Sequence, residues 1–100
     1  MWLICTKNLG PFMLNLKTTN RFDKDYVRQV KRGKDLKNMD RIIDSILNGK
    51  PLEIKHRDHP LKGDYVGHRE CHIEPDWLLI YKKTEEDLIL VRTGTHSDLF

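Results

Sequence analysis

Side chains suited to acid–base chemistry recur at even spacing along one short stretch, GHRECHIEPD. His68, Glu70 and His72 lie two residues apart, and side chains two residues apart in an extended strand share one face. Asp76 follows in the EPD segment, close in sequence to His72. The spacing therefore predicts a group of imidazoles and carboxylates on one side of a strand.

The segment LVRTGTHSDLF supplies a cation, another imidazole and an aromatic ring. If strand alternation runs through LILVR, Arg92 shares a face with Leu88 and Leu90. His96 follows just beyond this strand, and we expect the GTHSDLF tail to fold back over an open sheet face. Phe100 would then either offer a flat surface to an unstacked base or dock the tail onto the core.

Three kinds of site are compatible with these residues. A single histidine on a strand is most often structural. His56 and His59 lie three apart in HRDH and could bind a metal ion, although two imidazoles without a second pair are a weak signature. RNA cleavage needs a base, an acid and cations, because the 2′-hydroxyl is the nucleophile and charge builds up around phosphorus. Histidine, carboxylate and arginine side chains supply these groups without a metal or cofactor.

Charge is divided unevenly along the chain. Residues 17–57 carry 12 basic and 6 acidic side chains, an excess of +6, whereas residues 58–100 carry 5 basic and 9 acidic ones, a balance of −4. The second part nevertheless holds four of the five histidines. Either the first part forms a basic surface that attracts polyanions, or these charges are ordinary solvated helix faces.

Composition indicates one small cytoplasmic domain with no membrane association. A chain of 100 residues suits a single hydrophobic core, and no apolar run approaches the roughly 20 residues of a membrane span. Cys5 and Cys71 lie far apart without a CxxC pair, so we expect reduced thiols. The opening MWLICTKNLGPF fits the pattern of neither a signal peptide nor an anchor, so we expect neither there. We interpret residues 1–12 as an extension, or a translated leader if Met13 is the start, and residues 13–100 as the domain.

Hydrophobic periodicity predicts a strand and two helices before the histidine-rich part. Alternation in MLNLKTT predicts a strand, and Thr19 or Asn20 then caps a helix over about residues 21–32. Its apolar stripe would be Phe22, Tyr26 and Val30.

A second helix is predicted between Gly33 and NGKP, with Asp35 as its cap. Its apolar residues recur at three- and four-residue spacing: Leu36, Met39, Ile42, Ile43, Ile46 and Leu47. The two helices form a hairpin.

After Pro51 the pattern changes to strands at YVGHRECHI, WLLIYKK and LILVRTG, joined by turns at EPD and TEED. The order predicts an α+β fold, with an N-terminal strand, a helical hairpin and a three-stranded antiparallel meander. The helices should pack on one sheet face, which leaves the other face for the site.

Three motifs in order after the helical hairpin, HRDHPLKG, GHRECHIEPDWLLIYK and LVRTGTHSDLF, resemble the YafQ-type branch of the RelE/ParE toxin superfamily. The resemblance spans about residues 13–100, and the three motifs in register make it specific. It implies a RelE-like fold and the toxin of a type II toxin–antitoxin system. Such a toxin is a ribosome-dependent endoribonuclease that cuts messenger RNA in the decoding site.

The resemblance also implies roles for individual residues. The family's catalytic positions match four residues here: His59, His72, Asp76 and His96. His96 would protonate the leaving 5′-oxygen, Arg92 would bind phosphate, and Phe100 matches a terminal aromatic. Glu70 stands where relatives often place aspartate, a departure that argues against a direct catalytic role and groups it with the RNA-binding and phosphate-binding residues. His56 and His68 match no catalytic position and should lie at the surface.

The sequence is compatible with alternatives for the general base and for the function. The general base could be a neutral His59 or the Asp76 carboxylate. A ParE-like member of the same fold would instead inhibit DNA gyrase by binding, without any use for the histidine set. The implied partners are an acidic, partly disordered cognate antitoxin, the ribosome with its messenger RNA, and operator DNA only through the antitoxin complex.

Overall fold

The computed structural model describes residues 14–100, so the predicted extension over residues 1–12 lies outside the described part. Five strands, three α-helices and two 3-10 turns follow one another in this order: β1 (Asn15–Thr18), α1 (Asn20–Lys31), α2 (Leu36–Leu47), η2 (Ile54–His56), β2 (His59–Pro60), η3 (Gly63–Tyr65), β3 (Arg69–Glu74), β4 (Trp77–Lys83), β5 (Asp87–Gly94) and α3 (His96–Leu99). Within residues 14–100, no helix has the length and apolar character needed to cross a membrane.

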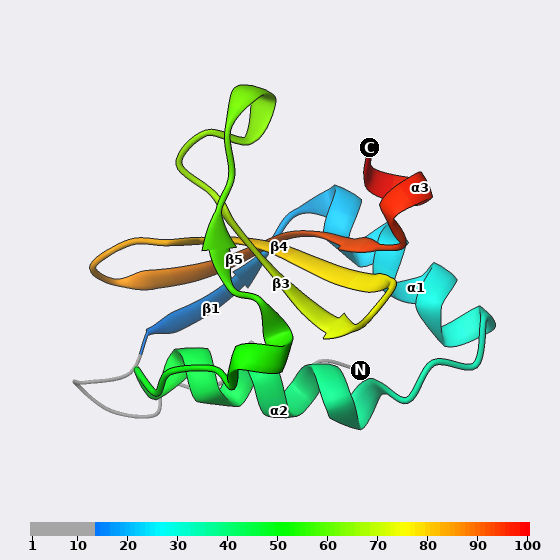
Figure 1. Ribbon diagram of the computed structural model, residues 1–100, viewed down its shortest axis with the longest axis horizontal. Helices are drawn as coiled ribbons and strands as arrows, with labels where there is room; N and C mark the ends of the chain where they lie inside the picture. The colour runs from blue at the N-terminus through cyan, green and yellow to red at the C-terminus, as the bar shows by residue number, and fades with distance from the viewer. Residues whose placement is uncertain (1–13) are drawn as a thin grey trace.

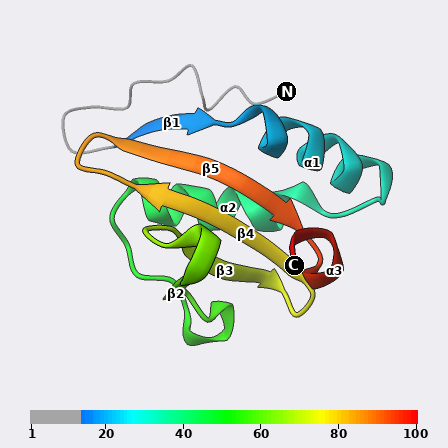
Figure 2. The ribbon, with the colours of Figure 1, turned by 90° about the horizontal axis from the view of Figure 1, so that it is seen from above.

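One twisted sheet holds all five strands in the order β1-β5-β4-β3-β2 (Figure 2). Strands β3, β4 and β5 form the predicted antiparallel meander. The N-terminal strand adds to it beside β5 in parallel, with Leu16 opposite Leu88. A parallel neighbour requires a long crossover connection, and the two helices and the first meander strands provide it. The α+β fold class is confirmed.

Side-chain caps begin both long helices. Thr19 Oγ1 accepts the backbone N–H of Phe22 at 3.0 Å, and Asp35 Oδ1 accepts that of Lys37 at 3.1 Å. Between the helices Gly33 has a φ of +78°, a left-handed conformation that costs glycine little and ends a helix. Both predicted starts are therefore confirmed to within a residue or two.

The buried face of α1 differs from the predicted stripe. Phe22 is fully buried and Tyr26 is half-buried, but Val30 is 48% exposed. The residues that pack toward β5 are instead Phe22, Asp25 and Gln29. The stripe prediction is wrong at Val30 because it followed apolar side chains, whereas this helix turns two polar ones inward.

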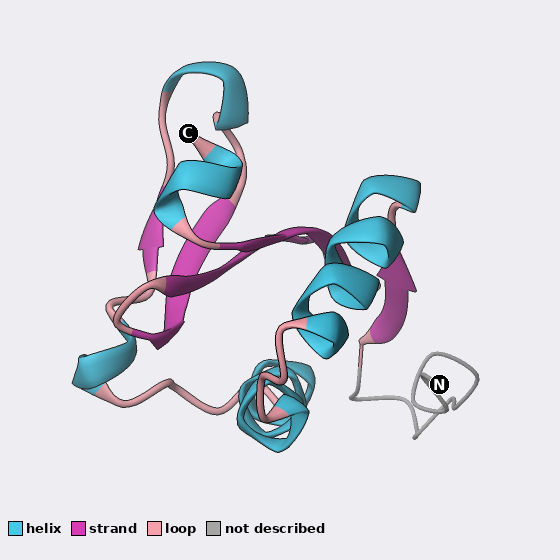
Figure 3. Ribbon diagram, turned by 90° about the vertical axis from the view of Figure 1, so that its right-hand side faces the viewer, coloured by secondary structure: helices cyan, strands magenta, loops and turns pink. Residues whose placement is uncertain are grey.

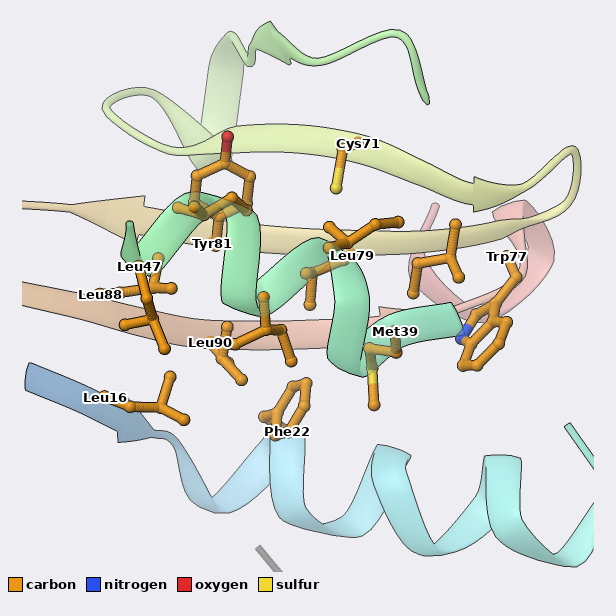
Figure 4. Close-up of a cluster of buried hydrophobic side chains, with 14 residues drawn as sticks. Leu16, Phe22, Met39, Leu47, Cys71, Trp77, Leu79, Tyr81, Leu88 and Leu90 are labelled. Carbon is orange, nitrogen blue, oxygen red and sulfur yellow. The ribbon is translucent and has the colours of Figure 1, made fainter. Parts of the chain in front are cut away.

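The main core lies between α2 and one face of the sheet (Figure 4). Met39 and Ile43 of α2 are fully buried there against Leu79 and Leu90 of the sheet, as the second helical pattern predicted. Cys71 belongs to the same core, and burial raises the pKa of its thiol well above the usual range. A buried neutral thiol is chemically inert. The expected reduced state is supported for Cys71, which is a free cysteine, whereas Cys5 lies outside the described residues.

The opposite face carries a smaller apolar cluster of Leu78, Ile80 and Leu99, which α3 helps to cover. Figure 3 shows the C-terminal helix across the sheet from α2. The free face that the sequence predicted is thus partly closed by the tail, as the fold-back prediction required.

A bulge in β5 changes which residues share this face. Tyr81 pairs with Leu90, whereas the preceding Ile80 pairs with Arg92, so Val91 is an extra residue between them. An extra residue shifts the alternation by one position. Arg92 therefore lies on the face of Ile80, opposite Leu90, and the predicted common face of Leu88, Leu90 and Arg92 is wrong.

Candidate active site

Two histidines flank one buried carboxylate where β2 meets β3. His59 lies opposite Glu70 in the antiparallel register, and its Nε2 is 3.3 Å from Glu70 Oε1. His72 Nε2 approaches the same oxygen at 3.6 Å. The Glu70 side chain is 7% exposed, against 47% for His59. We call these three residues the His–Glu–His trio. The predicted common face of Glu70 and His72 is confirmed, and β2, too short to predict, adds His59.

A second acid–base pair lies beside the trio. His96 Nδ1 is 2.7 Å from Asp76 Oδ1, and the backbone N–H of His96 donates to the same oxygen at 3.0 Å. The backbone bond and then the ring bond hold the pKa of Asp76 below its usual value. The His72 and His96 ring centroids are 5.7 Å apart. This contact joins the trio and the His96–Asp76 pair into one cluster.

Helix α3 is held in place at its first turn, which positions His96. Thr95 and Asp98 form a capping box, in which each side chain accepts the other's backbone N–H. Arg32 of the segment after α1 donates to both Asp98 oxygens, at 2.6 and 3.1 Å. This pairing with Arg32 holds the pKa of Asp98 far below its usual range. The tail is thereby tied to the first helix as well as to the sheet.

Arg92, the predicted phosphate ligand, is held in a buried ion pair. Its Nε and Nη2 donate to Asp25 Oδ2 and Oδ1 at 2.7 and 3.2 Å, and both side chains are at most 10% exposed. The Thr93 backbone N–H also donates to Asp25, at 3.2 Å. Hydrogen bonding to Asp25 raises the pKa of Arg92, and a further hydrogen bond to Tyr65 also raises it. Sequence reasoning missed Asp25, although an acid three residues after the buried Phe22 was an available signal.

The two tail residues have different environments. Leu99 is 8% exposed and packs in the small cluster, whereas Phe100 is 65% exposed. The Phe100 ring meets the Tyr65 ring edge-on, with centroids 6.0 Å apart. Leu99 therefore docks the tail, and Phe100 with Tyr65 presents aromatic surface to solvent.

His56 and His68 were expected at the surface, and both are half-buried. His56 Nδ1 is 2.7 Å from the carbonyl oxygen of His72, which holds η2 against β3. His68 precedes β3, because that strand begins at Arg69, and its ring meets the Tyr65 ring edge-on at 5.8 Å. It therefore does not continue the face of Glu70 as predicted.

A polar network holds the chain just before His59. The Tyr81 hydroxyl donates to Asp58 Oδ1 at 2.7 Å, and Arg69 Nε donates to the same oxygen at 3.1 Å. Burial and the neighbouring Asp58 carboxylate raise the pKa of Tyr81 well above its usual value, so it stays a donor. Asp58 is thus anchored on two strands, and it positions the adjacent His59.

Within residues 14–100 the trio is also a group able to hold a metal ion. One donor atom from each of its side chains lies within 4.8 Å of the other two, and two imidazoles with a carboxylate are a known zinc donor set. The predicted pair of His56 and His59 is not the one formed, because His56 turns to the His72 carbonyl.

Comparison with known proteins gives consistent matches over the whole described chain. Residues 14–100 match the family described as a bacterial toxin of type II toxin–antitoxin system, YafQ. The mRNA interferase toxin YafQ of Escherichia coli K12 is 39% identical over 87 residues, covering 86% of this chain and 95% of that protein.

Solved structures agree. The E. coli DinJ–YafQ toxin–antitoxin complex matches with a TM-score of 0.82 and 38% identity, covering 88% of this chain and 98% of that one. A metal-bound toxin from Helicobacter pylori matches with a TM-score of 0.83 and 46% identity, covering 88% and 100%.

Proposed function

Because the chain belongs to the YafQ family of type II toxin–antitoxin toxins and is an mRNA interferase, we propose that it cuts messenger RNA in the ribosomal decoding site by metal-independent acid–base catalysis. One observation carries the mechanism. His59, Glu70 and His72 stand next to His96 and Asp76 on one sheet face, so base and acid candidates lie in one cluster. The E. coli relatives are mRNA interferases, which argues against the alternative of a gyrase-binding toxin.

The general acid in this proposal is His96. Asp76 accepts the Nδ1 proton of its ring, which leaves Nε2 as the nitrogen that delivers a proton. The Asp76 carboxylate also stabilises the imidazolium form, as the carboxylate does in other His–carboxylate pairs. Asp76 therefore positions the acid, and its engagement with His96 argues against Asp76 as the base.

The general base in this proposal is His59. It is the most exposed member of the trio, and the Glu70 carboxylate beside it stabilises the charge that it acquires on taking a proton. Glu70 itself is almost fully buried, which favours a positioning role. This supports the sequence-based view that Glu70 does not act directly.

The reaction is a transesterification. His59 removes the proton of the 2′-hydroxyl, the 2′-oxygen bonds to phosphorus, the bond from phosphorus to the 5′-oxygen breaks, and His96 protonates that oxygen. The products are a 2′,3′-cyclic phosphate and a 5′-hydroxyl. His72 and the Arg92 donors not used by Asp25 or Tyr65 would stabilise the extra charge on the phosphate. Phe100 would stack on an exposed base.

A cognate antitoxin is the partner that the family supports, since the E. coli relative is solved as the DinJ–YafQ complex. We propose that the antitoxin of this chain is acidic and partly disordered when free, matching the excess of positive charge over residues 17–57. Operator DNA would be bound only through that complex. Because the proposed activity depends on ribosomes, the toxin would act in the cytoplasm.

Primer extension on a translated message, with and without ribosomes, tests the proposal. We expect defined cleavage sites only when ribosomes are present, and their loss when the antitoxin is added first. Equal cleavage of free RNA would contradict ribosome dependence. A chain that is harmless in translating cells and leaves messages intact would contradict the function itself.

A further inference from the structure

A groove of about 840 Å³ lies between α2, the segment of residues 50–57 and β3. Figure 1 shows α2 and η2 on the same side of β3. The lining of the groove includes apolar side chains from α2, from residues 50–57 and from β3, among them Ile42, Leu52 and Ile73. The volume falls within the roughly 300–1,000 Å³ of ligand sites. The hydrogen bond from the His56 ring to the His72 carbonyl oxygen, 2.7 Å long, holds one wall against the sheet.

Positive charge surrounds this groove. Arg41, Lys50 and Arg57 line it, and among residues 14–100 none of them has a carboxylate within ion-pair distance. Both acids in the lining are already paired, Glu74 with Lys34 at 3.2 Å and Glu53 with Lys55 at 3.8 Å. The groove therefore offers three uncompensated cations to a polyanion.

The groove includes only part of the catalytic cluster. His72 and His96 line it, whereas His59 and Glu70 are not part of its lining. The proposed acid, His96, is therefore in the groove, and the proposed base, His59, is outside it. In the cleavage step the acid meets the 5′-oxygen, which belongs to the nucleotide on the 3′ side of the cut.

We propose that this groove holds the messenger strand on the 3′ side of the scissile phosphate, with Arg41, Lys50 and Arg57 binding its phosphates. The inference rests on the proposed function, because it uses the assignment of His96 as the acid. It adds a direction to the bound strand, with the upstream nucleotides on the His59 side. The apolar floor would accommodate sugars and base faces between the phosphate contacts.

The direction is tested by crosslinking on ribosomes. A message carries 4-thiouridine at one position either upstream or downstream of the cut, and His96→Gln toxin is used so that the message stays intact. We expect the downstream positions to crosslink to peptides within residues 38–57 and the upstream positions not to do so. Crosslinks to these peptides from upstream positions, or their absence from downstream positions, would overturn the proposal.

The charge contribution is tested with a matched pair of variants. The groove variant is Arg41→Gln, Lys50→Gln, Arg57→Gln. The control removes the same charge from exposed lysines elsewhere: Lys24→Gln, Lys82→Gln, Lys83→Gln. Thermal unfolding verifies that both variants are folded.

The groove variant should raise KM for messages that continue past the cut, on the order of 10-fold, with kcat near wild type. Each phosphate contact on a single strand contributes about 0.7 to the slope of log KM against log salt concentration, so loss of three contacts should lower that slope by about 2. On messages truncated just after the cut, the groove variant should match the control.

Equal behaviour of the groove variant and the control on long messages would overturn the proposal, provided that wild-type toxin cleaves. Absence of cleavage by wild-type toxin would instead contradict the proposed function. The two failures are therefore distinguishable.

Discussion

Replacing Asp25 by alanine should strongly destabilise the fold, although Asp25 belongs to no catalytic pair. The change removes both charge-assisted hydrogen bonds of the Arg92 guanidinium. The Arg92 side chain is only 10% exposed, so water cannot fully replace them. It also removes the acceptor of the Thr93 N–H. Breaking a buried ion pair on one side costs about 3–5 kcal/mol. That is a large share of the roughly 5–15 kcal/mol that stabilises a domain of this size.

Urea unfolding of three variants separates stability from catalysis. Asp25→Ala should lose about 3–5 kcal/mol, whereas the apolar double replacement Asp25→Leu with Arg92→Met should recover most of it, because no buried charge remains unpaired. If Arg92 binds phosphate, the double variant should still cleave poorly despite its recovered stability. A loss below about 1 kcal/mol for Asp25→Ala would refute the buried pairing. Wild-type cleavage by the folded double variant would refute the phosphate role of Arg92.

Three further predictions follow from the site. Phe100→Ala should weaken cleavage by the roughly 1–3 kcal/mol of one base stack at unchanged melting temperature, because the ring is 65% exposed; a melting point several degrees lower would make it a packing residue. Asp98→Asn should cost about 1–2 kcal/mol at pH 7, since the carboxylate pairs with Arg32. Folding lowers the pKa of Asp98. The contribution of its carboxylate to stability is therefore complete above the pKa of the unfolded chain, about 4, and falls as the pH drops below that value. Urea unfolding at pH 3 should accordingly show a smaller difference between wild type and variant. Stripping metal from the toxin should leave cleavage unchanged while ribosomal magnesium is kept, and added zinc should inhibit by occupying His59 and Glu70; activity that zinc specifically restores would contradict the acid–base mechanism.

Elements with strong local signals were predictable from the sequence. Strand β4 coincides with WLLIYKK, and the Asp35 cap and the apolar stripe of α2 appear as expected. These features depend on side-chain periodicity and on one capping hydrogen bond, both of which act over a few residues. The prediction of β3 succeeded only from Arg69, because the residues before it form a 3-10 helix and a turn.

Features set by tertiary contacts were not predictable. Strand β2 has two residues, too few for any periodicity, and it exists because it pairs with β3. The bulge at Val91 reverses the face of Arg92, and it is visible only in the pairing of β5 with β4. At the site, strand alternation correctly placed Glu70 with His72. The approach of His59 required the β2–β3 register, which the sequence does not show.

The most direct test of the catalytic account is the single-turnover cleavage rate of His96→Gln on programmed ribosomes, with analysis of the product ends. We expect wild-type toxin to leave a 2′,3′-cyclic phosphate and a 5′-hydroxyl. The variant should be slower by a factor of about 10²–10⁴, with unchanged unfolding and antitoxin binding, because the His96 side chain is 53% exposed and forms no part of the core. Cleavage by His96→Gln at the wild-type rate would contradict the mechanism.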